Sequence, residues 1–148
     1  MNRPLFRGTV ALIAAAVAAG AAVPLGGAPR QTLQAAEAVQ SVSWDRWLAA
    51  KAKAEECDAA GNLVAALQYY LEYTRQAEGL GSPLRVAWGK NNAAYMIIKM
   101  HRLDATVDLA PARKLLEEGL AIEGASEDCK RALASNLEHV KSILRSPL

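Results

Sequence analysis

The stretch SPLRVAWGKNNAAYMIIKM, residues 82–100, decides the fold class of this chain. Ser82 stands at an N-cap position, and Pro83 follows at the first helical position, where its missing N–H costs nothing. Because a helix that is apolar on most of its sides packs between neighbours, this segment predicts a central helix. Its main stripe recurs at three- and four-residue steps, with further apolar residues on the far face: Leu84, Ala87, Trp88, Asn91, Ala94, Tyr95 and Ile98, then Met96, Ile97 and Met100.

The same periodicity marks four more helices around this segment, at about residues 43–60, 62–79, 108–122 and 126–144. Residues 31–39 are either a sixth helix or a frayed lead-in. Connections of a few residues make neighbouring helices antiparallel. Similar units recur at steps of about 40 to 44 residues, which is typical of a solenoid. We therefore expect an all-α fold of stacked antiparallel helical hairpins.

Composition supports one helical domain and excludes several classes. The chain has 148 residues, of which 52% are apolar and 22% charged, as in a globular domain. Thirty-one alanines and a single Phe favour helix over strand. The formal charge of +2 comes from Arg3 and Arg7, since the other basic and acidic side chains balance at 15 each. We expect no nucleic-acid partner, because phosphate binding needs a clustered basic surface.

The N-terminal residues are typical of an export signal. Arg3 and Arg7 precede residues 8–23, none of which is charged. Small residues stand near the end of this stretch, at 19–22. These 16 uncharged residues fall short of the about 20 that span a membrane. We expect a signal peptide over residues 1–22, a linker or frayed helix over 23–42 and the helical domain over 43–148. The domain is then exported to the periplasm or cell surface; the alternative is an uncleaved membrane anchor with an extracytoplasmic domain.

Several segments resemble tetratricopeptide repeats. Ala66 precedes Tyr70, and Ala112 precedes Leu116, by the four positions that separate the small and large residues of that repeat's second helix. Lys-Asn-Asn-Ala-Ala-Tyr at 90–95, together with residues 114–122 and 135–137, resembles the longer-period repeats of kinesin light chains. The resemblance covers about residues 44–144 and implies about two and a half repeats. His101 departs from it by standing where glycine is usual, and residues 103–110 resemble an insertion.

The resemblance implies that the first helix of each pair lines a groove that receives a partner segment. Trp88 and Tyr95 lie two helical turns apart with Asn91 between them, which makes an aromatic–amide strip. Asn91 either faces a bound peptide or ties neighbouring helices together. The groove residues implied by this register, besides Leu48, are Lys51, Glu55, Trp88, Asn91, Tyr95, Lys99, Ser135 and His139.

No catalytic or metal-binding pattern competes with this interpretation. The two histidines, His101 and His139, lie on different predicted helices with no nucleophile motif beside them. Cys57 and Cys129 have no ligand-like spacing, and we expect two small buried side chains rather than a disulfide. The sequence predicts no cofactor and no enzyme activity. We expect an exported, non-catalytic protein–protein interaction module; the alternative is a self-associating scaffold of the cell envelope, which makes a homo-oligomer possible.

The export signal gives the first prediction. Cleavage after Ala21 or Ala22 would make the mature protein begin at Ala22 or Val23, because these small residues directly follow the apolar stretch. N-terminal sequencing of the native protein measures this directly. An intact Met1 recovered in the membrane fraction would instead establish the anchor.

Overall fold

A computed structural model of the chain describes residues 41–145. The predicted signal peptide, linker and lead-in helix, apart from residues 41 and 42, lie outside the described residues. Residues 41–145 contain no strand, so the all-α prediction is confirmed. The helices are α2 (Trp44–Ala59), α3 (Leu63–Gly79), α4 (Pro83–Leu103), α5 (Ala110–Leu120) and α6 (Glu127–Arg145). No helix within this part of the chain is both long and apolar enough to cross a bilayer.

The predicted starts of the first three helices are confirmed, with one difference in capping, whereas α5 runs from Ala110 to Leu120 rather than over about residues 108–122. The Ser43 hydroxyl accepts a hydrogen bond from the Arg46 N–H at 3.2 Å, and Asn62 Oδ1 accepts from the Ala65 N–H at 3.3 Å. Ser82 occupies the N-cap position of α4 but does not cap through its side chain; its hydroxyl instead accepts a hydrogen bond from Arg85 Nη1 at 3.1 Å. The side chain is thus already engaged by an arginine one turn into the helix.

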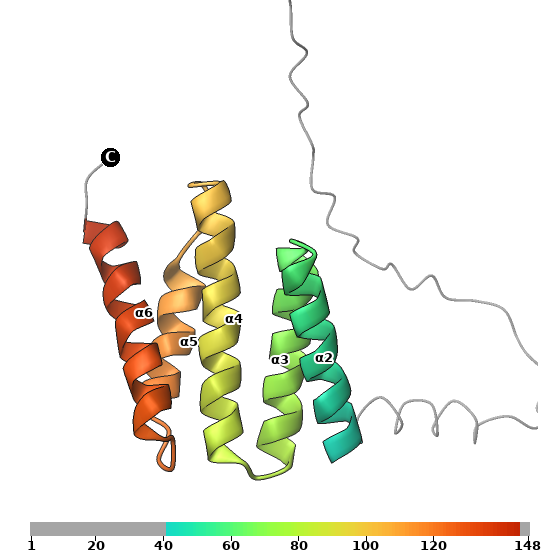
Figure 1. Cartoon of the computed structure of the whole chain (residues 1–148). Helices are drawn as coiled ribbons and strands as arrows, with labels where there is room; N and C mark the ends of the chain where they lie inside the picture. The colour runs from blue at the N-terminus through green and yellow to red at the C-terminus, as the bar shows by residue number, and fades with distance from the viewer. Residues whose placement is uncertain (1–40, 146–148) are drawn as a thin grey trace, which may run out of the picture. The chain divides into compact units, whose positions relative to one another are not determined.

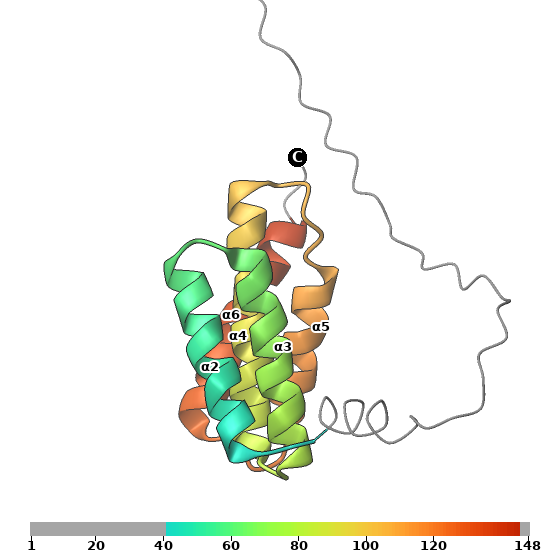
Figure 2. The same cartoon turned by 90° about the vertical axis from the view of Figure 1, so that its right-hand side faces the viewer.

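The helices form two layers (Figures 1 and 2). One layer contains α2, α4 and α6, and the other contains α3 and α5. Consecutive helices run antiparallel and pack against each other, and α4 also contacts α6. The central position predicted for residues 82–100 is confirmed, since α4 touches α3, α5 and α6.

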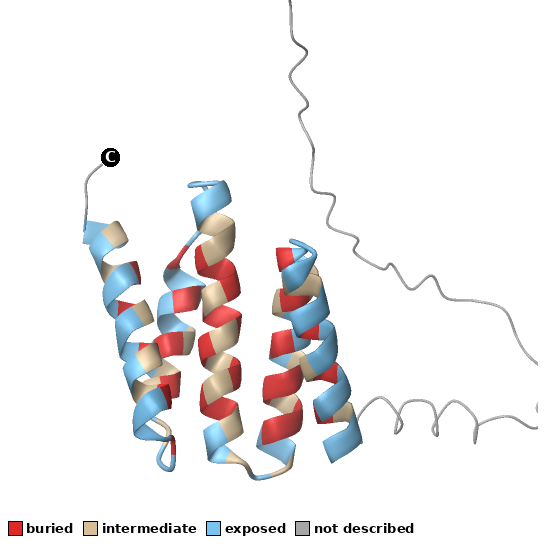
Figure 3. Ribbon diagram, viewed as in Figure 1, coloured by how far each residue is buried: buried red, intermediate tan, exposed pale blue. Residues whose placement is uncertain are grey.

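The core is continuous around α4. Figure 3 shows α4 mostly buried or half-buried along its length, whereas α2 and α6 carry broad exposed faces. Its fully buried Ala94 and Ile98 pack with Leu116 of α5 and Leu133 of α6 in the largest hydrophobic cluster. The C-terminal helix thereby seals one side of the core.

The two cysteines are free, as expected. Cys129 is buried in the cluster around α4, α5 and α6, and its burial raises the pKa of its thiol. Cys57 is half-buried against a different cluster, which contains Ala54 and Leu63. Each therefore contributes as a small apolar side chain to its own part of the core.

A fully buried glutamine holds the chain where it enters α2. Gln76 Oε1 accepts a hydrogen bond from the Ser43 N–H at 3.0 Å, and Gln76 Nε2 donates to Glu72 Oε1 at 2.8 Å. The bidentate hydrogen bond from Arg75 lowers the pKa of Glu72, which keeps that acceptor ionised. The start of α2 is thus fixed against the C-terminal half of α3.

The packing of α6 gives the second prediction. Leu133 is completely buried, and a Cβ built on Gly119 of α5 would come within 2.7 Å of Leu133 Cδ2. Leu133→Asp places an unpaired carboxylate there, which costs several kcal/mol of a total stability of about 5–15 kcal/mol. We expect a large fall in the thermal unfolding midpoint measured by circular dichroism, and Leu137→Asp should behave in the same way. Ala134→Asp, at the exposed position directly after Leu133, is the control. Equal midpoints for Leu133→Asp and Ala134→Asp would contradict this packing.

Candidate functional site

The candidate site lies on the layer that contains α2 and α4. Leu84, Trp88 and Tyr95 recur at steps of four and seven residues, so they lie on one side of α4. Trp44 and Leu48 lie one turn apart on α2. We call the surface formed by these five residues the α2–α4 face. Its two aromatic residues on α4 are half-buried: Trp88 packs on the main core cluster and Tyr95 on the cluster of Ala54 and Ala66.

An arginine joins the N-terminal ends of the two helices. The Arg85 guanidinium carbon lies 4.7 Å from the ring centroid of Trp44 and 4.9 Å from that of Trp47. The two indoles meet edge to face, with centroids 6.0 Å apart. Such cation–π contacts are worth about 0.5–2 kcal/mol, and they hold Trp44 in place although it is not buried. The α2–α4 face therefore has a preformed aromatic and cationic end.

A lysine joins the C-terminal ends of the same helices. Lys99 Nζ lies 2.6 Å from Asp58 Oδ1 of α2 and 5.2 Å from the ring centroid of Tyr95. The predicted site residue Lys99 is thus both an ion-pair partner and a cation–π partner. Arg85 thus joins the N-terminal ends of α2 and α4, and Lys99 joins their C-terminal ends. The two helices therefore run parallel, and the surface between these contacts is one continuous strip.

Lys51 and Glu55 form an ion pair within α2. Lys51 Nζ lies 2.6 Å from Glu55 Oε1, and both side chains are largely exposed. An exposed pair of this kind contributes less than about 1 kcal/mol. A ligand could separate these two predicted site residues at little cost.

Asn91 ties α4 to α6. Its side chain is buried, and its Oδ1 accepts a hydrogen bond from Asn136 Nδ2 at 3.0 Å. Its Nδ2 donates to Asn92 Oδ1 at 3.3 Å. Both ends of the amide are engaged by neighbouring side chains, which is the arrangement expected of an asparagine that links two helices.

Ser135 and His139 lie exposed on α6. His139 Nε2 lies 3.2 Å from Arg102 Nη2, and a neutral His139 accepts this hydrogen bond because guanidinium nitrogens only donate. The structure therefore brings the predicted His139 together with Arg102 of α4, which the sequence analysis did not single out.

Three further residues of this surface were missed by sequence reasoning: Leu84 as an exposed residue, Arg85 and Arg102. One signal could have pointed to the arginines, because α4 contains four Lys and Arg residues and no Asp or Glu. Among residues 41–145, no carboxylate oxygen lies within 4.0 Å of a nitrogen of Arg85 or Arg102, unlike the ion-paired Lys90 and Lys99. The open side of α4 is thus cationic as well as aromatic.

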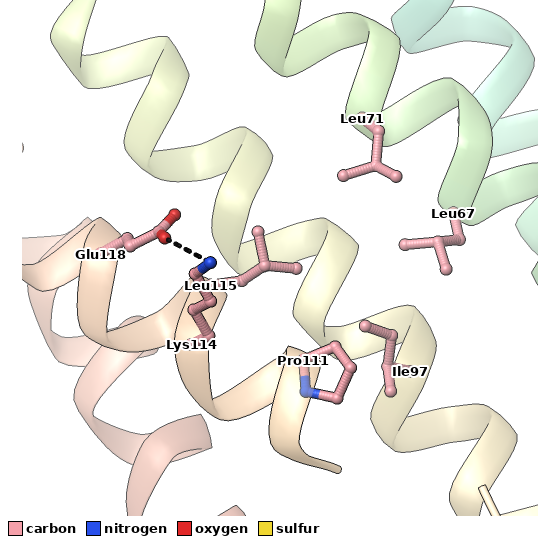
Figure 4. A pocket seen from close by; sticks show the side chains of 7 residues that line it. All are labelled: Leu67, Leu71, Ile97, Pro111, Lys114, Leu115 and Glu118. Carbon is pink, nitrogen blue, oxygen red and sulfur yellow. Dashed lines mark ion pairs between the residues drawn. The ribbon is translucent and has the colours of Figure 1, made fainter. Parts of the chain in front are cut away.

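A hollow lies in the other layer, between α3 and α5. It has a volume of about 370 Å³, and Figure 4 shows Leu67 and Leu71 of α3 facing Pro111 and Leu115 of α5 across Ile97 of α4. The Lys114–Glu118 pair of α5, with nitrogen and oxygen 3.9 Å apart, lies at its rim. This hollow was not predicted from the sequence.

Comparison of the chain with protein-family models, curated proteins and solved structures found no match. Within residues 41–145, no three His, Cys, Asp or Glu side chains are grouped closely enough to hold a metal ion. The shape and chemistry of the α2–α4 face and of the hollow between α3 and α5 are therefore the features that bear on function.

The bond between Asn91 and Asn136 gives the third prediction. Asn136→Ala removes the donor from α6 and leaves the buried Asn91 Oδ1 without it, at a cost of about 1–3 kcal/mol. Chemical denaturation should show this loss. Ser135→Ala, at the exposed neighbouring position, should leave stability nearly unchanged. Equal stabilities of the two variants would mean that the asparagine bond does not join the helices in solution.

Proposed function

We propose that this chain is a non-catalytic protein–protein interaction module that binds a segment of a partner protein across the α2–α4 face. The proposal includes a tetratricopeptide-like stacking of the helical hairpins and export of the domain beyond the cytoplasm. The five antiparallel helices, with α2, α4 and α6 in one layer, support the stacking. The apolar stretch behind Arg3 and Arg7 supports export. No cofactor is part of the proposal.

One observation carries the binding proposal. Three large apolar side chains of this face remain exposed: Trp44 by 47%, Leu48 by 54% and Leu84 by 37%. Leu84 lies one turn before Trp88 on α4, and Arg85 joins Trp44 to this end of α4, so the apolar surface is grouped rather than scattered. Grouped apolar and aromatic surface is characteristic of interaction sites, whereas single exposed leucines need no explanation.

The charges of the face define the partner segment. Arg85 and Arg102 have no carboxylate partner within residues 41–145, and Arg guanidinium groups bind carboxylates in a bidentate manner. We infer a segment with aromatic or aliphatic side chains for the apolar strip and acidic side chains for the two arginines. Ser135 and His139 extend the proposed contact surface onto α6.

The fourth prediction tests this face with exposed residues only. Trp88 and Tyr95 also pack on the core, so their replacement would change folding and binding together. Leu48 and Leu84 are exposed, and Leu48→Ser/Leu84→Ser should leave the unfolding midpoint nearly unchanged. Peptides selected by phage display on the chain should be rich in aromatic and acidic residues. They should bind this double variant at least about tenfold more weakly, a loss of about 1.4 kcal/mol.

Leu144→Ser is the matched control, since Leu144 is an exposed leucine near the C-terminal end of α6. Its affinity for the selected peptides should equal that of the unmodified chain. Equal affinity of the chain and the Leu48→Ser/Leu84→Ser variant would contradict the proposed site. A selection that enriches no peptide would contradict binding of linear segments.

A further inference from the structure

The open side of α4 meets α6 at a corner formed by Arg102, His139 and Ser135. The hydrogen bond between Asn91 and Asn136 joins the two helices, and His139 lies one turn after Asn136. Ser135 lies one turn before His139, and both are exposed. Arg102 reaches this turn of α6 from α4, since its Nη2 lies 3.2 Å from His139 Nε2. We call these three residues the α4–α6 corner.

The corner adjoins the α2–α4 face. Because consecutive helices are antiparallel, α4 and α6 run in the same direction. Tyr95 lies one turn after Asn91 on α4, as His139 lies one turn after Asn136 on α6. Since the two asparagines are hydrogen-bonded to each other, Tyr95 and His139 lie at the same level along this layer. A segment that lies along α4 over Tyr95 thus passes beside the corner.

Arg102 is the charged side chain in contact with His139, and no carboxylate neutralises it. Among residues 41–145, no carboxylate oxygen lies within 4.0 Å of a nitrogen of Arg102 or His139, whereas the other charged side chains of α5 and of this end of α4 form ion pairs of their own: Arg113–Glu117, Lys114–Glu118 and Lys99–Asp58. On α6, the side chains three and four positions from His139 are uncharged: Ser135, Asn136, Ser142 and Ile143. The corner is therefore cationic and has no partner of opposite charge in contact.

The contact between Arg102 and His139 depends on the protonation of the imidazole. A guanidinium group only donates hydrogen bonds, so His139 Nε2 accepts this one and carries no proton in it. A proton at Nε2 removes the acceptor and places two cations side by side. A carboxylate between them removes this conflict, because its two oxygens accept from the guanidinium and from the imidazolium together. Carboxylate binding and proton uptake therefore favour each other.

We propose that the α4–α6 corner binds an acidic side chain of the partner segment and takes up a proton at His139 when it does so. This inference rests on the proposed binding at the α2–α4 face, and it adds where the acidic residue lies and how pH controls the affinity. Arg102 supplies the permanent charge, and His139 supplies the charge that depends on pH. Imidazole is the side chain whose charge ordinarily changes between about pH 5 and about pH 8. The affinity for an acidic segment therefore rises as the pH falls through this range.

Isothermal titration calorimetry of the chain with histidine-free peptides selected by phage display tests the proton uptake. The peptides carry an amidated C-terminus, so that their acidic side chains are their only carboxylates. We expect the affinity to rise at least about threefold between about pH 7.5 and about pH 5.5, a range in which these side chains stay ionised. Titrations in two buffers of different ionisation enthalpy should show a net uptake of protons on binding.

His139→Gln removes the proton site and keeps a hydrogen-bond acceptor for Arg102, because a glutamine oxygen accepts but takes up no proton. The affinities of this variant at the two pH values should be equal, with no proton uptake. Peptides with Gln and Asn in place of their acidic residues should also bind the unmodified chain without pH dependence. His101→Gln is the matched control, since His101 is the other histidine of the chain and its Nδ1 lies 2.8 Å from the Val107 carbonyl oxygen. This control should keep the pH dependence.

Equal affinities of the unmodified chain at the two pH values would overturn this inference, and so would proton uptake that persists in His139→Gln. Peptides that need Leu48 and Leu84 but bind without proton uptake would leave the proposed function in place and overturn the role of the corner alone. Peptides that bind the Leu48→Ser/Leu84→Ser variant as tightly as the unmodified chain would contradict the α2–α4 face and the inference that rests on it. A selection that enriches no peptide would overturn both.

Discussion

The close approach of α3 and α4 at Gly89 is the constraint on which the rest of the domain depends. A Cβ at this position would lie 2.2 Å from Thr74 Oγ1 and 2.8 Å from Tyr73 Cδ1, so no larger residue fits without movement. The Thr74 hydroxyl is itself held by its hydrogen bond to the Tyr70 carbonyl at 2.8 Å. Because α2 pairs with α3 and α4 pairs with α5, the contact between α3 and α4 joins the two halves of the domain.

Burial of α4 on several sides leaves it one open strip, with several of its polar side chains at this strip or at its borders, whereas Lys90 binds Glu118 of α5. Arg85 and Lys99 lie at the strip and join α4 to α2 through Trp44 and Asp58, while Asn91 joins it to α6. The polar residues of the central helix are therefore structural as well as available for binding. This explains why truncation of one of these polar residues cannot by itself separate folding from partner recognition.

Local sequence signals predicted the helices well, and tertiary contacts were predicted less well. Gly61 and Gly81 end α2 and α3 with positive φ values of 74° and 64°, which side chains rarely adopt, so the breaks were visible in the sequence. The register of α4 placed Tyr95 and Lys99 on one face, and Lys99 Nζ lies 5.2 Å from the ring centroid of Tyr95. By contrast, the contacts of Arg85 with Trp44 and of Arg102 with His139 join residues 41 and 37 positions apart, respectively. No periodicity within one helix encodes such pairs, and the hollow between α3 and α5 likewise exists only once three helices are packed.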